Sequence, residues 1–219
     1  MPKVKTYHLK PTRRIPNSHL PVLHYPSQFE SAGIAASEIY DILERNGWTV
    51  QWIYRYGTTQ EAHYHSTAHE CMTVLSGQAT IRLGAGDTSP DLEESTNGRG
   101  FEDGGVEIQV AAGDTLVIPA GVSHKTYDTT PAAKFALLTP GHGAGIEADD
   151  RREAVASVEL SGFAMLGAYP VGSHWDFQTG AVLSQTSWPA IWEIPVPDND
   201  PVLGKSSAGL CGLWSSSRG

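Results

Sequence analysis

The feature that most constrains the fold is a series of short apolar segments between residues 48 and 140, separated by Gly, Pro or Asp. Segments such as ATIRLG, GVEIQVAAG and DTLVIPAG have the length and the residue types of β-strands. Many short strands with turn residues between them favour a closed barrel or a sandwich. No internal repeat is found, so we expect one all-β barrel whose core spans residues 48–140.

The segments on either side of this core differ from it. Residues 1–30 are rich in Pro and basic residues, and they predict an extended arm. The segment SEIYDILERNG predicts a helix, with Ser37 as its N-cap and Gly47 as its stop. The next segment, WTVQWIYRYG, predicts a strand that places large side chains on one face: Trp48, Val50, Trp52, Tyr54 and Tyr56.

Two further regions complete the predicted domain. The acidic, Gly-rich stretch from Gly84 to Gly105 predicts a long, exposed and mobile loop. Residues 141–219 contain four of the six tryptophans, which predicts an extension that packs its aromatic side chains on the barrel. With residues 1–47 as the arm and helix, we expect residues 1–219 to form a single domain.

Composition excludes several classes of function. The formal net charge of −9 argues against nucleic acid, which needs a basic face. No run of eighteen apolar residues predicts a membrane span, and the N-terminal residues lack the apolar core of a secretory signal. Two cysteines are too few for a disulfide scaffold. We therefore expect a cytoplasmic protein that acts on a small molecule.

Ionisable side chains gather just before one of the predicted strands, in GTTQEAHYHSTAHECMTVLSG. His63 and His65 are two residues apart, so a strand would place both imidazoles on one face. Glu70 begins the next strand and shares its face with Met72 and Val74. A buried carboxylate at this position needs a partner, and a metal ion would supply one.

A fourth ligand is expected from the segment GDTLVIPAGVSHKTYD, in which His124 begins a strand after a tight turn. Three imidazoles and one carboxylate form a mixed nitrogen and oxygen site that suits a first-row divalent metal. Cys71 adjoins Glu70 but should face the opposite way. A polar cluster without metal is the alternative, although four convergent ionisable groups in a barrel need neutralisation.

Both segments resemble the two motifs of the cupin superfamily. The first has the spacing Gly57, His63, His65, Glu70 and Gly77, and the second has Gly113, Pro119, Gly121 and His124. The second motif usually ends with Asn, where this chain has Asp128. Over nearly its whole length the chain is similar to the YjlB-type cupins, through GAYPVGSHWDF and PDNDPVLGKSSAGLCGLW.

The resemblance implies a double-stranded β-helix, the jelly-roll barrel, with a short N-terminal helix and a C-terminal wrap. It implies that His63, His65, Glu70 and His124 hold one divalent metal ion, for which we favour Fe²⁺ or Mn²⁺ over Zn²⁺, Ni²⁺ or Cu²⁺. It also implies a homodimer, because members of the superfamily commonly pair their sheets.

The function expected first is a metal-dependent, oxygen-using enzyme of the dioxygenase type, acting on a small organic substrate. A Lewis-acid isomerase, epimerase or decarboxylase is an alternative, and a non-catalytic metal- or ligand-binding module is another. Tyr54 and Tyr56 are candidate catalytic residues that offer a proton near the metal, or else packing residues. The expected substrate-lining residues are Trp52, Met72, Val74 and Thr126.

Overall fold

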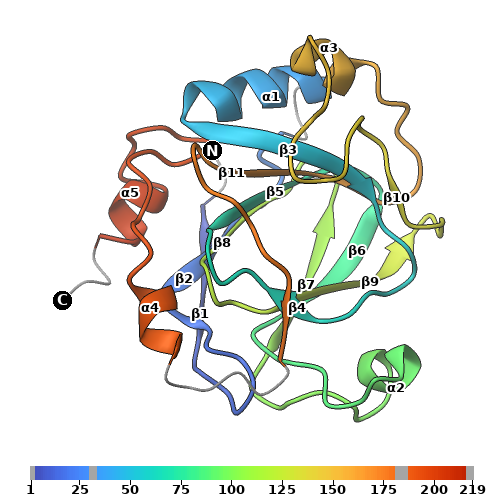
Figure 1. Ribbon diagram of the computed structural model, residues 1–219, viewed down its shortest axis with the longest axis vertical. Helices are drawn as coiled ribbons and strands as arrows, with labels where there is room; N and C mark the ends of the chain where they lie inside the picture. The colour runs from blue at the N-terminus through green and yellow to red at the C-terminus, as the bar shows by residue number, and fades with distance from the viewer. Residues whose placement is uncertain (1–2, 30–33, 181–186, 216–219) are drawn as a thin grey trace.

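The computed structural model describes residues 3–29, 34–180 and 187–215, which form two antiparallel sheets (Figure 1). The seven-stranded sheet has the order β1-β2-β8-β5-β11-β3-β10. Its strands are Lys5–Leu9 (β1), Ser18–Tyr25 (β2), Thr115–Ile118 (β8), Glu70–Ser76 (β5), Ala164–Pro170 (β11), Trp48–Arg55 (β3) and Ala136–Leu137 (β10). The five-stranded sheet has the order β12-β4-β9-β6-β7. Its strands are Gln178–Thr179 (β12), His63–Tyr64 (β4), His124–Thr130 (β9), Gln78–Leu83 (β6) and Val106–Ala111 (β7).

The two sheets enclose the main apolar core between them. Met72 and Val74 of β5 pack there with Ile81 and Leu83 of β6, and all four are buried. Cys71 points to the outer face of the seven-stranded sheet, as strand alternation predicts. The predicted jelly-roll barrel is therefore confirmed.

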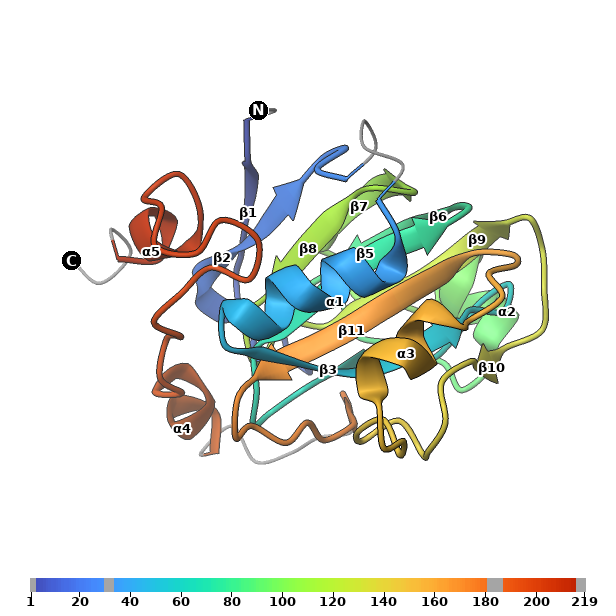
Figure 2. The same ribbon diagram turned by 90° about the horizontal axis from the view of Figure 1, so that it is seen from above.

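A second core lies on the outer face of the seven-stranded sheet, under helices α1 (Ala36–Arg45) and α3 (Arg151–Ala156) (Figure 2). The predicted N-cap of α1 is wrong by two residues. Ala35 is the N-cap, and its N–H donates to the Glu38 carboxylate at 2.9 Å. Ser37 is buried inside the first turn. Gly47 follows the helix with a φ of 82°, as its predicted role as the stop requires.

The predicted boundaries of the barrel are too narrow. Within residues 1–30, β1 and β2 replace the expected extended arm, and β2 pairs with β8 in the sheet. At the other end, β11 lies between β5 and β3, although it is outside residues 48–140. The proline within β2 and the glycine and proline within β11 are unfavourable in strands, so neither segment was predicted as a strand. Residues 1–2, 30–33, 181–186 and 216–219 lie outside the described residues, as do the predictions that fall on them.

The predicted common face of β3 is also wrong, because the strand contains a bulge. Gly167 of β11 pairs with Trp52, and the next residue, Ala168, pairs with Val50. The extra residue reverses the alternation. Trp48 and Val50 therefore pack in the outer core, whereas Trp52, Tyr54 and Tyr56 pack in the barrel interior.

The segment between Gly84 and Gly105 is more ordered in its contacts than its composition predicts. It contains the short helix α2 (Leu92–Thr96). The Arg82 guanidinium donates to two α2 carbonyl oxygens at 2.9 Å each and lies 3.5 Å from the ring centre of Phe101. The buried Lys125 ammonium contacts both carboxylate oxygens of Asp87 at 3.1 Å. The cationic side chains of Arg82 and Lys125 thus hold this segment against the barrel.

Asp128, at the end of the second motif, has a left-handed backbone conformation. Asp128 has a φ of 51° and lies at a register shift between β6 and β9. Asn and Asp both tolerate this left-handed conformation, because their short side chains can hydrogen-bond locally. The change from the usual Asn therefore preserves the bulge.

The C-terminal extension packs on the barrel beside β1 and β2, where Figure 1 shows α4 (Trp188–Trp192) and α5 (Leu210–Leu213). Trp214 is fully buried, and its indole N–H donates to the Pro21 carbonyl of β2 at 2.8 Å. Trp192 donates to the Asn17 carbonyl at 2.9 Å. Among the described helices, none has the length and apolar character needed to cross a membrane.

Candidate metal centre

The four predicted ligands come together inside the barrel, from both sheets. His63 of β4 and His124 of β9 are paired directly across the five-stranded sheet. His65 follows β4, and Glu70 begins β5 in the opposite sheet. All four side chains are buried, and the three histidines each offer one ring nitrogen within 4.8 Å of the others. This is the one such cluster found among the residues that the structure describes.

The Glu70 carboxylate faces this cluster. Its Oε1 lies 3.2 Å from His65 Nε2, and its Oε2 lies 3.2 Å from His124 Nε2. Oε2 is buried and makes no hydrogen bond within the described residues. An unpaired carboxylate oxygen beside three convergent nitrogens fits a divalent cation, which would satisfy all of them at once.

The opposite nitrogen of each histidine is held by the backbone. The Nδ1 atoms of His63 and His124 lie 3.1 Å and 3.3 Å from carbonyl oxygens, and that of His65 makes a short contact with a third. These carbonyls belong to Glu61, Val122 and Asp176. The hydrogen-bond network therefore assigns the proton to Nδ1, which leaves each Nε2 lone pair free to bind a metal.

Glu70 is oriented by a chain of two aromatic side chains that the sequence did not indicate. The Tyr169 hydroxyl of β11 donates to Glu70 Oε1, and the Trp52 indole N–H donates to the Tyr169 oxygen at 3.3 Å. The Trp52 ring lies against Gly167, where an added Cβ would come within 2.0 Å of it. Only glycine at this position lets Trp52 reach Tyr169.

The electrostatics of the cluster favour neutral imidazoles and an ionised carboxylate. Burial holds the pKa of His63 well below its ordinary value, and the nearby His124 and His65 lower it further. Burial also lowers the pKa of His124. Burial alone would raise the pKa of Glu70, but His65, His124 and the Tyr169 hydrogen bond outweigh it and bring it to about 2. These are the protonation states in which such groups bind a metal.

His65 differs from the other two histidines. Burial would lower its pKa, but Glu70 and the carbonyl of Asp176 favour the charged ring, so the pKa of His65 is raised. In the metal-free protein, the Glu70 carboxylate thus favours the protonated form of His65. A bound cation would compete with a proton at this ring.

A cavity of about 230 Å³ opens directly above the four side chains, which form part of its wall. Three predicted pocket residues line it: Trp52, Tyr54 and Tyr56. Met72, Val74 and Thr126 were also predicted to line the substrate site, but they are buried outside the wall of this cavity. Strand alternation correctly predicted that these side chains point into the barrel interior. It could not indicate how deep in the barrel they lie.

Five lining residues were missed, and two of them form an exposed rim. Phe135 is 59 % exposed and Phe177 is 51 % exposed. The Phe177 ring stacks on His63 with 4.1 Å between ring centres. The other three missed residues are Gln60, Tyr169 and Trp175. Trp175, expected to be a core residue, thus faces the cavity. The aromatic content of GAYPVGSHWDF was the available signal.

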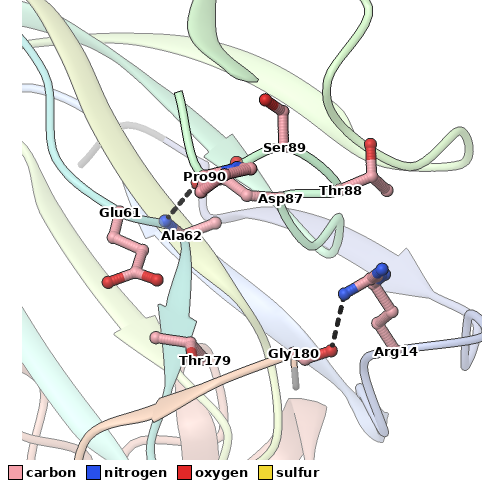
Figure 3. A pocket seen from close by; sticks show the side chains of 9 residues that line it. All are labelled: Arg14, Glu61, Ala62, Asp87, Thr88, Ser89, Pro90, Thr179 and Gly180. Carbon is pink, nitrogen blue, oxygen red and sulfur yellow. Dashed lines mark hydrogen bonds between the residues drawn. The ribbon is translucent and has the colours of Figure 1, made fainter. Parts of the chain in front are cut away.

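A second hollow, of about 240 Å³, lies beside β4 and is polar (Figure 3). Two of its three charged side chains, Asp87 and Arg14, already have partners within the protein. Asp87 accepts from the Ala62 N–H at 2.9 Å and pairs with Lys125, and Arg14 donates to the Gly180 carbonyl at 3.2 Å. The hollow therefore lacks the convergent, unpaired groups that distinguish the histidine cavity.

Comparison with known proteins finds one curated relative over almost the full length. The uncharacterized protein YjlB of Bacillus subtilis (strain 168) is 27% identical over 217 residues, which cover 97% of each chain. Similar solved structures include oxalate decarboxylase from Bacillus subtilis, with 12% identity and a TM-score of 0.29 over 80% of this chain and 29% of that one. A vicilin from Capsicum annuum has 13% identity and a TM-score of 0.32, over 81% and 35% of the two chains.

The chain spans about a third or less of these larger solved proteins. The family model described as Cupin matches residues 29–157, more than half of the chain and both histidine-bearing segments. By this match, its jelly-roll sheets and its cluster of three histidines and a glutamate, the chain belongs to the cupin family.

Proposed function

We propose that this cupin is a metal-dependent enzyme that oxidises a small organic substrate with dioxygen. One observation carries the proposal: His63, His65, Glu70 and His124 form the wall of a cavity whose rim is exposed. A purely structural metal site is closed by its protein ligands, whereas a catalytic site keeps a position open. Here the ligands would face a space large enough for a substrate.

When bound, a divalent metal could activate dioxygen or polarise a substrate oxygen, and the imidazole and carboxylate donors suit Fe²⁺ or Mn²⁺. We favour dioxygen activation over polarisation of a substrate oxygen because of the side chains around the site. Among the described lining residues, Glu70 is the sole carboxylate, and it would be a ligand. Isomerisation or epimerisation by proton abstraction would need a separate base.

The tyrosines of the cavity are donors and not bases. Burial raises the pKa of Tyr54, and burial together with Glu70 holds the pKa of Tyr56 and of Tyr169 well above its ordinary value. Their hydroxyl groups thus remain protonated at neutral pH. We propose that Tyr54 and Tyr56 hold a proton toward the oxygen of the substrate, and that Tyr169 positions Glu70.

The overall reaction that we propose places both atoms of one dioxygen molecule in the product, so no external reductant is needed. The aromatic wall would exclude water from the reacting atoms. The substrate would enter past the exposed rim formed by Phe135 and Phe177.

The experiment compares the same metal-free protein after loading with Fe(II), Mn(II) or Zn(II), with and without dioxygen. Oxygen uptake is measured against a panel of small acids, enols and catechols. We expect turnover with Fe(II) or Mn(II) in the presence of dioxygen only. Equal turnover with Zn(II) under argon would contradict the oxygenase proposal and favour a Lewis-acid enzyme. Metal binding without turnover of any substrate in the panel would favour a binding module.

A further inference from the structure

The cavity above the metal cluster is walled mainly by aromatic rings from separate parts of the chain. Trp52, Tyr54 and Tyr56 come from β3 and the residue after it. The others precede β10, lie in β11 or follow it: Phe135, Tyr169, Trp175 and Phe177. Aromatic walls of this kind favour planar, polarisable ligands over aliphatic ones of the same size.

Several of these rings are arranged in nearly parallel pairs. Phe177 lies at 15° to His63, with 4.1 Å between ring centres, and Phe135 lies at 18° to Tyr54, with 5.1 Å between centres. Tyr169 and Trp175 also lie at 18° to each other. The cavity therefore presents flat ring faces and edges, to which a planar ring is complementary in shape.

The two rim phenylalanines leave apolar surface in contact with water. They are among five large apolar side chains exposed on the described surface, and both line this cavity. An exposed apolar patch at the mouth of a pocket marks a binding site. A ligand that stacks on these rings would remove that surface from water.

The charge of the wall disfavours small anions. No Lys or Arg is among the described lining residues. A divalent ion and the Glu70 carboxylate would together leave one positive charge. One oxygen donor that loses a proton on binding would balance this charge, whereas a dicarboxylate would bury an excess negative charge with no side chain to pair it.

The volume limits the ligand to one ring. A cavity of about 230 Å³ holds the equivalent of roughly eight water molecules at about 30 Å³ each. This is below the roughly 300 to 1,000 Å³ of pockets for drug-sized ligands. We propose that the pocket takes a planar, single-ring aromatic molecule that is uncharged in solution and carries a hydroxyl oxygen, a phenol or a catechol. The inference rests on the proposed metal site and names its substrate class.

The test measures binding without turnover. Protein loaded with redox-inert Zn(II) is titrated under argon by calorimetry with three probes: 4-methylphenol, its saturated analogue 4-methylcyclohexanol, and malonate. We expect 4-methylphenol to bind at least about tenfold more tightly than either of the others. A metal analysis of each sample comes first, because absence of bound metal would overturn the proposed function, whereas the ranking of probes tests the substrate class.

The Phe177 ring provides a matched pair of variants at an exposed position. Phe177→Leu should weaken 4-methylphenol about three- to tenfold, the range expected for one aromatic contact, and Phe177→Tyr should not. Neither should alter metal content. Tighter binding of malonate, or equal binding of the saturated analogue, would overturn the inference. It would also be overturned if Phe177→Leu halved the molar mass in light scattering without weakening 4-methylphenol, since the rim would then be a protein contact.

Discussion

Replacing Tyr169 by Phe removes one hydroxyl group from the support of the proposed metal centre. That hydroxyl donates to Glu70 Oε1 and accepts from the Trp52 indole at 3.3 Å. All three side chains are buried, so removal of the hydroxyl takes a protein hydrogen-bond partner from two buried polar groups. Tyr169→Phe would leave Glu70 less firmly oriented and the Trp52 N–H without an acceptor.

The two losses have different consequences. The unpaired Trp52 N–H is present with and without metal, so it should lower the free energy of unfolding of both forms by about 1 to 3 kcal/mol. The lost contact to Glu70 acts on the ligand itself. Loss of such a supporting hydrogen bond typically costs about 10- to 100-fold in metal affinity, or about 1.4 to 2.7 kcal/mol.

The assay is a competition titration of metal-free protein against a chelator of known affinity, at constant pH, together with urea unfolding of the metal-free protein. Tyr54→Phe is the matched control, since Tyr54 lines the same cavity and its ring stacks on Phe135. We expect weaker metal binding in Tyr169→Phe and unchanged binding in Tyr54→Phe. Unchanged affinity in Tyr169→Phe, or an equal loss in both variants, would refute the positioning role.

Three further predictions concern the fold. Burial would raise the pKa of Asp114, but hydrogen bonds from His24 and two backbone N–H groups lower it. The ionised Asp114 carboxylate therefore stabilises the folded state above about pH 4, and this stabilisation is lost as the pH falls through the folded-state pKa. In urea unfolding from pH 7 to 2, Asp114→Asn should lower the free energy of unfolding by about 1 to 3 kcal/mol at pH 7, and this free energy should then fall less steeply as the pH drops. An unchanged pH profile would contradict this. Gly77→Ala should lower the melting temperature severely, because its Cβ would lie 2.5 Å from one carbonyl oxygen and 2.8 Å from another at a φ of 72°; a near-normal value by calorimetry would be unexpected. Limited proteolysis should cut residues 84–105 faster in Arg82→Met than in the unaltered protein, because the contacts of the guanidinium with two α2 carbonyl oxygens are lost; an unchanged rate would contradict the anchoring.

The sequence was sufficient for those parts of the fold that local patterns encode. Alternation placed Glu70 inward and Cys71 outward, and the spacing of His63 and His65 identified two of the clustered side chains. The place of His124 at the start of a strand after a tight turn identified a third, although its pairing with His63 was not predicted. These relations depend on strand period and short turns, which a sequence shows directly.

The remainder depends on contacts between distant segments. The bulge in β3 arises where Trp52 packs on Gly167, more than a hundred residues away, so periodicity alone placed Trp48 and Trp52 on the same face. Tyr169 lies on a strand that contains Gly167 and ends at Pro170, two residue types that are depleted in strands. The rim residue Phe177 reaches the cavity through the path of the C-terminal segment, which no local pattern indicates.

The central claim is that His63, His65, Glu70 and His124 hold one divalent ion. It is tested most directly by the metal content of anaerobically purified protein, measured by mass spectrometry beside the double variant His63→Ala, His65→Ala. Circular dichroism verifies that the variant is folded. We expect about one metal ion per chain in the unaltered protein and almost none in the folded variant. Full metal occupancy in the double variant would contradict the account.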